Sequence, residues 1–490
     1  MKGVAYLGAL SNFSASKEAR VVTAWMAATL LALLPPAAND SVVSLRPIRY
    51  NLDIKVDIDS QQLIGHAHIV VVNASTSAVN SASFLLYRLM RASAVRDAKG
   101  SPLTFTQPVV EFDDHPTLQA RQIIVTLPRP LAAGDSTQIA IDYRGELLGY
   151  AETGMLYVRD HIDSAYTLIR DDAFAFPYVG LPSHRANRAA GQAAYSYRAR
   201  ITVPDGFTVA NGGRMTGRTS SSGWTTFAYQ NIKPAWRMDF AVARFTVLES
   251  GTVRIFHLPE DSAGGKRILD VMNRTLSTYS RWFGSMSSAS QFTLIEIPTG
   301  WGSQADVTSI LQTAAAFRNS QRQYELYHEL SHLWNVNATD RPSPRWEEGL
   351  ATFMEDITTD SIERRVTTDS SADRIAERLA SRIKDDAQLT QIPMVSYGSE
   401  GMAGNSYSVG ALMFYTMYRL IGHQRFVRLI GEYYRRYGAT GGSTDDFTRL
   451  AKELSPVPLD KVFDDWMYSP HWTQLVSAMP GHSIPGRYRR

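Results

Sequence analysis

The sequence predicts a multidomain α+β protein in which a strand-rich N-terminal part is followed by a mainly helical part. The first observation is a change of hydrophobic period. Short runs that alternate apolar and polar residues fill the chain from Leu45 to about Pro259, and helical periodicity prevails after Pro259. The second observation is length, because 490 residues provide for two to four domains. The third is composition, because 44% hydrophobic and 20% charged residues are typical of globular proteins.

The first residues are distinct from both parts. Lys17 and Arg20 precede an apolar run over 21–34, which is followed by two prolines and two alanines at 35–38. A positive segment, an apolar segment and small residues in this order indicate a secretory signal peptide, here residues 1–38. The apolar run is shorter than the roughly 20 residues of a membrane span, so the alternative, an uncleaved anchor, is less favoured. We expect export to the periplasm or the medium, with no stable membrane span after cleavage.

The composition excludes several classes of site and partner. The chain has no cysteine, so disulfides, thiolate metal ligands and a cysteine nucleophile are excluded. Any metal site must therefore use histidine and carboxylate ligands. The formal net charge is only +3 and the aromatic residues are dispersed, so a nucleic-acid partner is not expected. The composition makes no prediction of oligomeric state.

The strand-rich part is predicted to be an N-terminal β domain over residues 39–259. Its alternating runs are separated by turn residues and recur at short spacing, which is typical of an antiparallel sandwich or saddle. The expected strands are 50–58, 63–72, 122–127, 137–143, 195–203, 224–229 and 239–245.

The helical part is predicted to be a second domain over residues 260–480. Helices are expected at 266–283, 313–336, 347–358, 371–386, 407–421, 424–437 and 444–453, with one strand at 291–298. The polar stretch 369–373 reads as a loop. Residues 481–490, rich in proline, glycine and arginine, are expected to form a frayed tail.

The strongest chemical signal is the motif His328-Glu329-Leu330-Ser331-His332. It lies in a stretch without glycine or proline that suits a helix. Histidines at i and i+4 lie on one face of a helix, where two imidazoles can bind one metal ion, and the intervening glutamate can act as a general base on a water molecule. The alternative is a pair of surface histidines, because so short a motif also arises by chance. Glu348, sixteen residues after His332, is the candidate third ligand, with Glu347 as the alternative.

Further segments stand in a recognisable order around this motif. The strand-rich part contains Arg49-Tyr50-Asn51-Leu52 with Gly65-His66-Ala67, then Phe176-Pro177. The helical part contains Glu348-Gly349-Leu350-Ala351 and Tyr407-Ser408-Val409-Gly410-Ala411. Together these segments resemble the aminopeptidase N-type gluzincin metallopeptidases, a family that also includes leukotriene hydrolase. The resemblance covers about residues 45–470, nearly the whole chain after the signal.

The resemblance implies a thermolysin-like catalytic domain that carries zinc. Its zinc ligands would be His328, His332 and Glu348, and Glu329 would be the general base. Tyr407 would stabilise the oxyanion of the tetrahedral intermediate, and the substrate would be a peptide or protein.

One departure from the family bears on substrate choice. Gly300-Trp301-Gly302-Ser303-Gln304 stands where the aminopeptidases carry Gly-x-Met-Glu-Asn, whose glutamate binds the α-amino group of the substrate. Ser303 takes the place of that glutamate, so the sequence leaves exopeptidase and endopeptidase activity open. Trp301, Gly302, Ser303 and Gln304 are the candidate substrate-binding residues. The functional alternatives to a peptidase are a catalytically silent relative that binds peptides or proteins, and a hydrolase of a non-peptide substrate.

Overall fold

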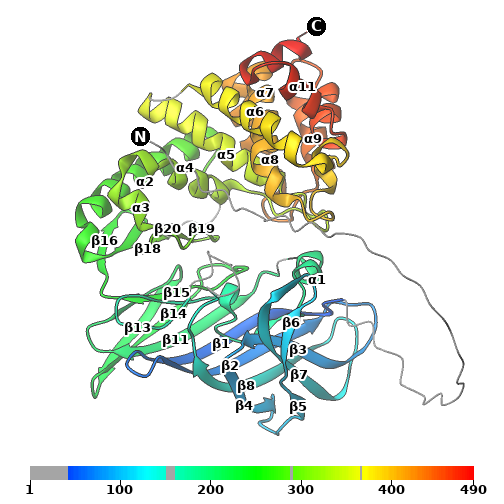
Figure 1. Ribbon diagram of the computed structural model, residues 1–490. Helices are drawn as coiled ribbons and strands as arrows, with labels where there is room; N and C mark the ends of the chain where they lie inside the picture. The colour runs from blue at the N-terminus through cyan, green and yellow to red at the C-terminus, as the bar shows by residue number, and fades with distance from the viewer. Residues whose placement is uncertain (1–41, 151–159, 192, 287–290, 365–366, 490) are drawn as a thin grey trace, which may run out of the picture. The chain divides into compact units, whose positions relative to one another are not determined.

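The computed structural model describes residues 42–150, 160–191, 193–286, 291–364 and 367–489. The expected signal peptide lies outside these residues. None of the described helices combines the length and the apolar character that are needed to cross a membrane. The strands of the N-terminal part and the helices of the C-terminal part are shown in Figure 1.

The largest sheet of the N-terminal part has seven strands in the order β13-β14-β11-β1-β2-β8-β4. All neighbouring strands are antiparallel except β1 and β11, which are parallel. The strands are β1 Leu45–Asp57, β2 Gln62–Asn73, β4 Met90–Asp97, β8 Ser136–Glu146, β11 Ser196–Pro204, β13 Arg214–Ser221 and β14 Trp224–Gln230. Alternate side chains of β1 and β2 are buried, as expected of strands with one face on a core.

Two smaller sheets complete this part. The first has the order β10-β3-β7-β5, with β6 also paired to β7, and the second has the order β12-β15-β9. Their strands are β3 Val79–Tyr87, β5 Phe105–Thr106, β6 Val109–Phe112, β7 His115–Leu131, β9 Thr167–Ile169, β10 Tyr178–Val179, β12 Thr208–Ala210 and β15 Phe240–Ala243. The short helix α1, His184–Ala190, follows β10. Ile54 and Ile69 of the seven-stranded sheet share one apolar core with Phe84 and Ile123 of β3 and β7, so the predicted sandwich is confirmed, apart from the parallel pair.

The C-terminal part begins with a five-stranded sheet in the order β16-β17-β18-β20-β19. Its strands are β16 Thr246–Ser250, β17 Val253–His257, β18 Phe292–Ile297, β19 Gln304–Ala305 and β20 Ser309–Thr313. Strands β17, β18 and β20 are parallel. Strands β16 and β17 belong to this sheet, so its first strand, β16, begins before the domain boundary expected at 259/260.

Helices form the rest of the C-terminal part and surround one apolar core. They are α2 Ser262–Phe283, α3 Ala314–Arg318, α4 Tyr324–Ser331, α5 Trp346–Thr358, α6 Thr368–Asp385, α7 Ser406–Ile421, α8 His423–Tyr437, α9 Thr444–Leu454, α10 Asp460–Phe463 and α11 Trp472–Ala478. This strand-to-helix order confirms the predicted α+β class.

Three local expectations were wrong. The helix expected over 313–336 is interrupted after α3, where the side chain of Asn319 accepts a hydrogen bond from the backbone of Gln321 and starts a separate turn. The loop expected over 369–373 is the first part of α6, because Thr367 caps that helix with a hydrogen bond from the Ser370 backbone.

The expected frayed tail is also ordered. Residues Gly481–Tyr488 form a 3₁₀ helix, and Ile484 is fully buried. The Tyr488 hydroxyl donates to Asp465 over 3.0 Å and accepts from the Trp466 indole over 3.1 Å. Tertiary contacts therefore hold a segment whose composition suggested disorder.

Helices α4, α5 and α7 position the chemically interesting side chains. Helix α5 packs closely on α7 because both have a glycine at the contact. A Cβ atom on Gly349 would lie 2.4 Å from the Gly410 Cα and 2.6 Å from the Ser406 carbonyl oxygen. No side chain fits between the helices at this point, so the distance from α5 to α7 is fixed beside Glu348.

Candidate metal centre

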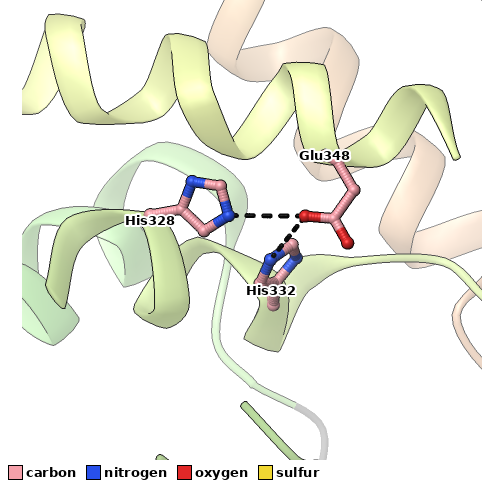
Figure 2. A group of neighbouring side chains, drawn as sticks. All are labelled: His328, His332 and Glu348. Carbon is pink, nitrogen blue, oxygen red and sulfur yellow. Dashed lines mark ion pairs between the residues drawn. The ribbon is translucent and has the colours of Figure 1, made fainter. Parts of the chain in front are cut away.

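Helix α4 and the turn after it carry the two motif histidines. His328 lies in the last turn of α4, and His332 begins the 3₁₀ turn His332–Trp334. The two rings meet edge to face with their centroids 4.9 Å apart. Both rings present Nε2 to the same carboxylate (Figure 2), so the i, i+4 spacing places two imidazoles on one side, as expected.

Glu348 reaches the histidines from the first turn of α5. Its Oε2 lies 3.4 Å from His328 Nε2 and 3.5 Å from His332 Nε2 (Figure 2). Its other oxygen, Oε1, accepts a hydrogen bond from Arg345. Burial by itself would raise the pKa of Glu348, but its interactions with His332, His328 and the Arg345 guanidinium hold that pKa well below its ordinary value. The third group is therefore an ionised carboxylate.

These three side chains fit a metal ion. The ligand atoms of His328, His332 and Glu348 lie within 4.8 Å of one another, and tetrahedral zinc with bonds of roughly 2.0–2.1 Å separates its ligands by about 3.4 Å. Glu348 Oε2 is buried and has no hydrogen-bond partner among the described residues. A buried carboxylate oxygen without a donor is costly, and a cation between the two rings would satisfy it.

Each histidine has a partner on the ring nitrogen that faces away from Glu348. His328 Nδ1 lies 2.7 Å from Glu355 Oε1, and His332 Nδ1 lies 2.6 Å from the Asn335 side-chain amide. A histidine that ligates through Nε2 carries its proton on Nδ1 and donates it. The metal-binding tautomer therefore requires that Asn335 present its amide oxygen to His332, as Glu355 presents a carboxylate oxygen to His328.

Arg345 is a neighbour of the site that the sequence did not reveal. It precedes α5 in a left-handed conformation, with φ 59°, which costs a non-glycine residue about 1–3 kcal/mol. Its side chain is 44% exposed and binds Glu348. No sequence pattern marks this contact, because it depends on the turn into α5. The left-handed turn at Arg345 thus goes together with a guanidinium group placed beside the candidate ligand.

The candidate base and the candidate oxyanion donor lie beside the ligands. Burial raises the pKa of Glu329, and the neighbouring histidines oppose that rise. The ring of Tyr407 stacks on His328 with an interplanar angle of 9° and a centroid distance of 5.9 Å. Burial and the Glu348 carboxylate raise the pKa of Tyr407 above its ordinary value, so its hydroxyl keeps its proton and can donate it in a hydrogen bond.

Glu347, the alternative ligand, is turned away from the histidines. Its Oε1 accepts a hydrogen bond from the Ser343 hydroxyl over 3.5 Å, and it does not belong to the group of converging ligand atoms. Adjacent residues on a helix point in different directions, so only one of the two glutamates can face α4.

Comparison with known proteins relates the part of the chain that carries this site to a known family. Residues 306–466 match the Peptidase family M1 domain. The chain is 21% identical to aminopeptidase M1-C of Oryza sativa subsp. japonica over 89% of this chain and 51% of that protein. It is 24% identical to the glutamyl aminopeptidase of Sus scrofa over 50% of this chain and 28% of that protein. The chain therefore spans about half the length of the first of these relatives and less than a third of the length of the second.

A solved structure shows the same fold over nearly its whole length. The M1 zinc metallopeptidase from Deinococcus radiodurans aligns with a TM-score of 0.62 at 19% identity, covering 87% of this chain and 96% of that one. Residues 306–466 therefore carry a Peptidase family M1 domain, and the chain as a whole is similar to the aminopeptidase N-type gluzincins. The family resemblance predicted from the sequence is thus confirmed, and zinc, the expected metal, fits the His-His-Glu group.

The candidate substrate-binding stretch is held by internal contacts. The hydroxyl of Ser303 accepts hydrogen bonds from Gln312 Nε2 over 3.0 Å and from the Thr313 backbone over 3.2 Å. Trp301 is only 5% exposed and packs edge to face on Tyr166, so its ring lies in a core rather than on an open surface. Gly302 adopts a positive φ of 70°, which suits glycine.

Gln304 is joined to a buried charge cluster of the N-terminal part. Its Oε1 accepts hydrogen bonds from Arg170 over 2.8 Å and from Arg237 over 2.6 Å. Its Nε2 donates to Asp172 over 3.0 Å. Since both ends of this side-chain amide are engaged, Gln304 fixes strand β19 in place. A role in substrate binding for residues 301–304 stays a prediction.

Proposed function

We propose that this protein is an exported zinc metallopeptidase that hydrolyses peptide bonds with Glu329 as general base. The observation that carries the proposal is the convergence of His328, His332 and Glu348 on one buried carboxylate oxygen that accepts no hydrogen bond from the described residues. A peptide-binding domain without catalytic activity has no need of three converging ligands with Glu329 beside them.

The residues of this chain divide the chemistry among them. Bound zinc supplies a Lewis acid that polarises a carbonyl group and acidifies a water molecule. Glu329 takes a proton from the attacking water and returns it to the leaving amine. The Tyr407 hydroxyl donates a hydrogen bond to the oxyanion, and a preorganised donor of this kind is worth about 3–4 kcal/mol. Glu355 and Asn335 keep the two histidine rings in the orientation that exposes Nε2.

Peptides are the substrate class that the relatives support. A variant of the M1 zinc metallopeptidase from Deinococcus radiodurans has been solved with Tyr-Ser-Ala bound as substrate, and this chain shares its fold. Ser303 stands where a carboxylate would bind the substrate's amino group, so we propose peptidase activity without assigning it to free amino termini alone.

Metal content and cleavage test this proposal together. Purified protein is expected to contain one zinc ion per chain by mass spectrometry, and His328→Ala is expected to lose it. Wild type should cleave a peptide library, whereas Glu329→Gln should retain zinc and lose cleavage. An N-acetylated copy of the library separates the modes: equal cleavage of both copies indicates an endopeptidase, and cleavage of free peptides alone indicates an aminopeptidase. A zinc-loaded wild type that cleaves neither library would refute the proposed activity.

Export is tested separately on the full chain. Expression with its own N-terminus should place the protein outside the cytoplasm, and sequencing of the mature N-terminus should show cleavage near Ala38. A cytoplasmic protein that retains residues 1–38 would refute export without bearing on the zinc chemistry.

A further inference from the structure

A cavity of about 400 Å³ lies beside the metal centre, among α4, α5 and α6. Its walls include Tyr324 of α4, Thr352 and Glu355 of α5, and Arg374 and Arg378 of α6. Small-molecule sites in proteins commonly have volumes of about 300–1,000 Å³. The cavity is therefore large enough for an amino-acid side chain.

The cavity begins within one helical turn of two candidate zinc ligands. Tyr324 lies four residues before His328 on α4, and Thr352 lies four residues after Glu348 on α5. Residues four apart on a helix are neighbours on the same face, with Cβ atoms about 5–6 Å apart. Glu355 is shared by both sites, because it lines the cavity and binds His328 Nδ1 over 2.7 Å. A substrate whose scissile bond lies at the metal can thus place an adjacent group in this cavity.

The α6 wall carries two guanidinium groups. Arg374 and Arg378 are four residues apart, so they lie on one face of α6. Within the described ranges, neither is recorded in an ion pair with a carboxylate, and the Arg374 Nη2 donates only to the Ser371 hydroxyl over 2.8 Å. Arginine presents a planar fork of donors that matches a carboxylate. Most of the donor capacity of this wall is therefore available to a ligand.

The acidic groups of the opposite wall are already engaged. The Glu355 carboxylate holds His328. Burial raises the pKa of Asp356 to about 7, and the hydrogen bond from Ser371 and the charge of Arg374 oppose that rise without cancelling it. At neutral pH the wall therefore carries less negative charge than its two carboxyl groups suggest.

We propose that this cavity is a carboxylate-binding subsite of the substrate cleft, in which Arg374 and Arg378 bind a carboxylate next to the scissile bond. The inference rests on the proposed peptidase function and names its preferred substrates. The carboxylate comes either from an acidic side chain or from the C-terminus of a short peptide. Both sources offer the same group to the guanidinium pair, and the experiment distinguishes them.

The test compares wild type, the double variant R374A/R378A and the control Arg382→Ala. Arg382 is exposed and lies one turn further along α6, and it does not line the cavity. Two peptide sets are used. One has Glu, Gln or Lys on either side of the cleaved bond, and the other has short peptides with a free or an amidated C-terminus. Zinc content and circular dichroism of the variants should match those of wild type, because both arginines are exposed.

Wild type and Arg382→Ala are expected to favour a carboxylate over its neutral counterpart by about 10-fold or more in kcat/KM, as a charge-assisted hydrogen bond predicts. The double variant should lower that ratio to near 1. A preference in the first set identifies the acidic side chain and its side of the bond, and a preference in the second set identifies the C-terminus. The same ratio in wild type and R374A/R378A, or a preference for Lys, would overturn the proposal.

Binding keeps the test independent of turnover. Calorimetry with zinc-loaded Glu329→Gln, with and without the α6 substitutions, should show the same loss of carboxylate preference in Kd. If wild type cleaves nothing while this binding preference is found, the peptidase proposal fails and the subsite stands. If wild type cleaves peptides without any charge preference, the subsite proposal fails and the peptidase proposal stands.

Discussion

Glu355 gives the sharpest prediction about the metal centre. The variant Glu355→Ala removes the carboxylate that lies 2.7 Å from His328 Nδ1, in a pair whose side chains are 11% and 23% exposed. A hydrogen bond to a charged group at such a site is worth about 1.5–3 kcal/mol, and loss of a partner behind a metal ligand typically weakens metal binding about 10–100-fold. We therefore expect the zinc Kd to rise about 10–100-fold.

The measurement is competition for zinc with a chromogenic chelator at fixed pH. Glu355→Gln retains an acceptor oxygen but not the charge, so its zinc Kd should rise less than that of Glu355→Ala. Glu347→Gln is the matched control, because Glu347 neighbours the candidate ligand Glu348 and accepts a hydrogen bond from Ser343 rather than from a candidate ligand histidine. A change of less than about 3-fold in Glu355→Ala would refute the reasoning that this carboxylate orients His328.

Three other predictions concern the oxyanion donor, a buried acid and a helix contact. Tyr407→Phe should lower kcat about 10²–10³-fold with zinc content unchanged, and an undiminished kcat would remove Tyr407 from the mechanism. Burial raises the pKa of Asp306 from 3.8 to about 7, so the unfolded chain loses this proton first and the free energy of unfolding falls as pH rises from about 4 to 7. Asp306→Asn should remove up to about 3 kcal/mol of the fall between pH 5 and pH 8, measured by chemical denaturation at these two pH values; equal pH dependence in both proteins would contradict it. Gly349→Ala forces a Cβ against α7 and should lower the free energy of unfolding by about 1–3 kcal/mol. Its Tm should be lower than that of the control Gly404→Ala, whose Cβ would meet nothing within 4 Å. Equal Tm values would refute the close contact.

Local patterns in the sequence were sufficient for the class of fold and for the core of the site. Alternation of apolar residues reports directly on strands with one buried face, as β1 and β2 show. The i, i+4 spacing of His328 and His332 is likewise a property of the helix itself. The local signals failed where a tertiary contact determined the outcome, as in the tail 481–488, which is held by Asp465 and Trp466.

The sequence by itself determined the β-then-α organisation, the family, and the residue types of the metal centre. Only the tertiary structure decided which glutamate faces the histidines, because that depends on how α5 approaches α4 and α7 at Gly349. The structure also showed that Arg345 binds Glu348, that Glu355 binds His328, and that Arg374 and Arg378 line a cavity. These contacts join residues on different turns or elements, and their geometry is set by packing rather than by any local period.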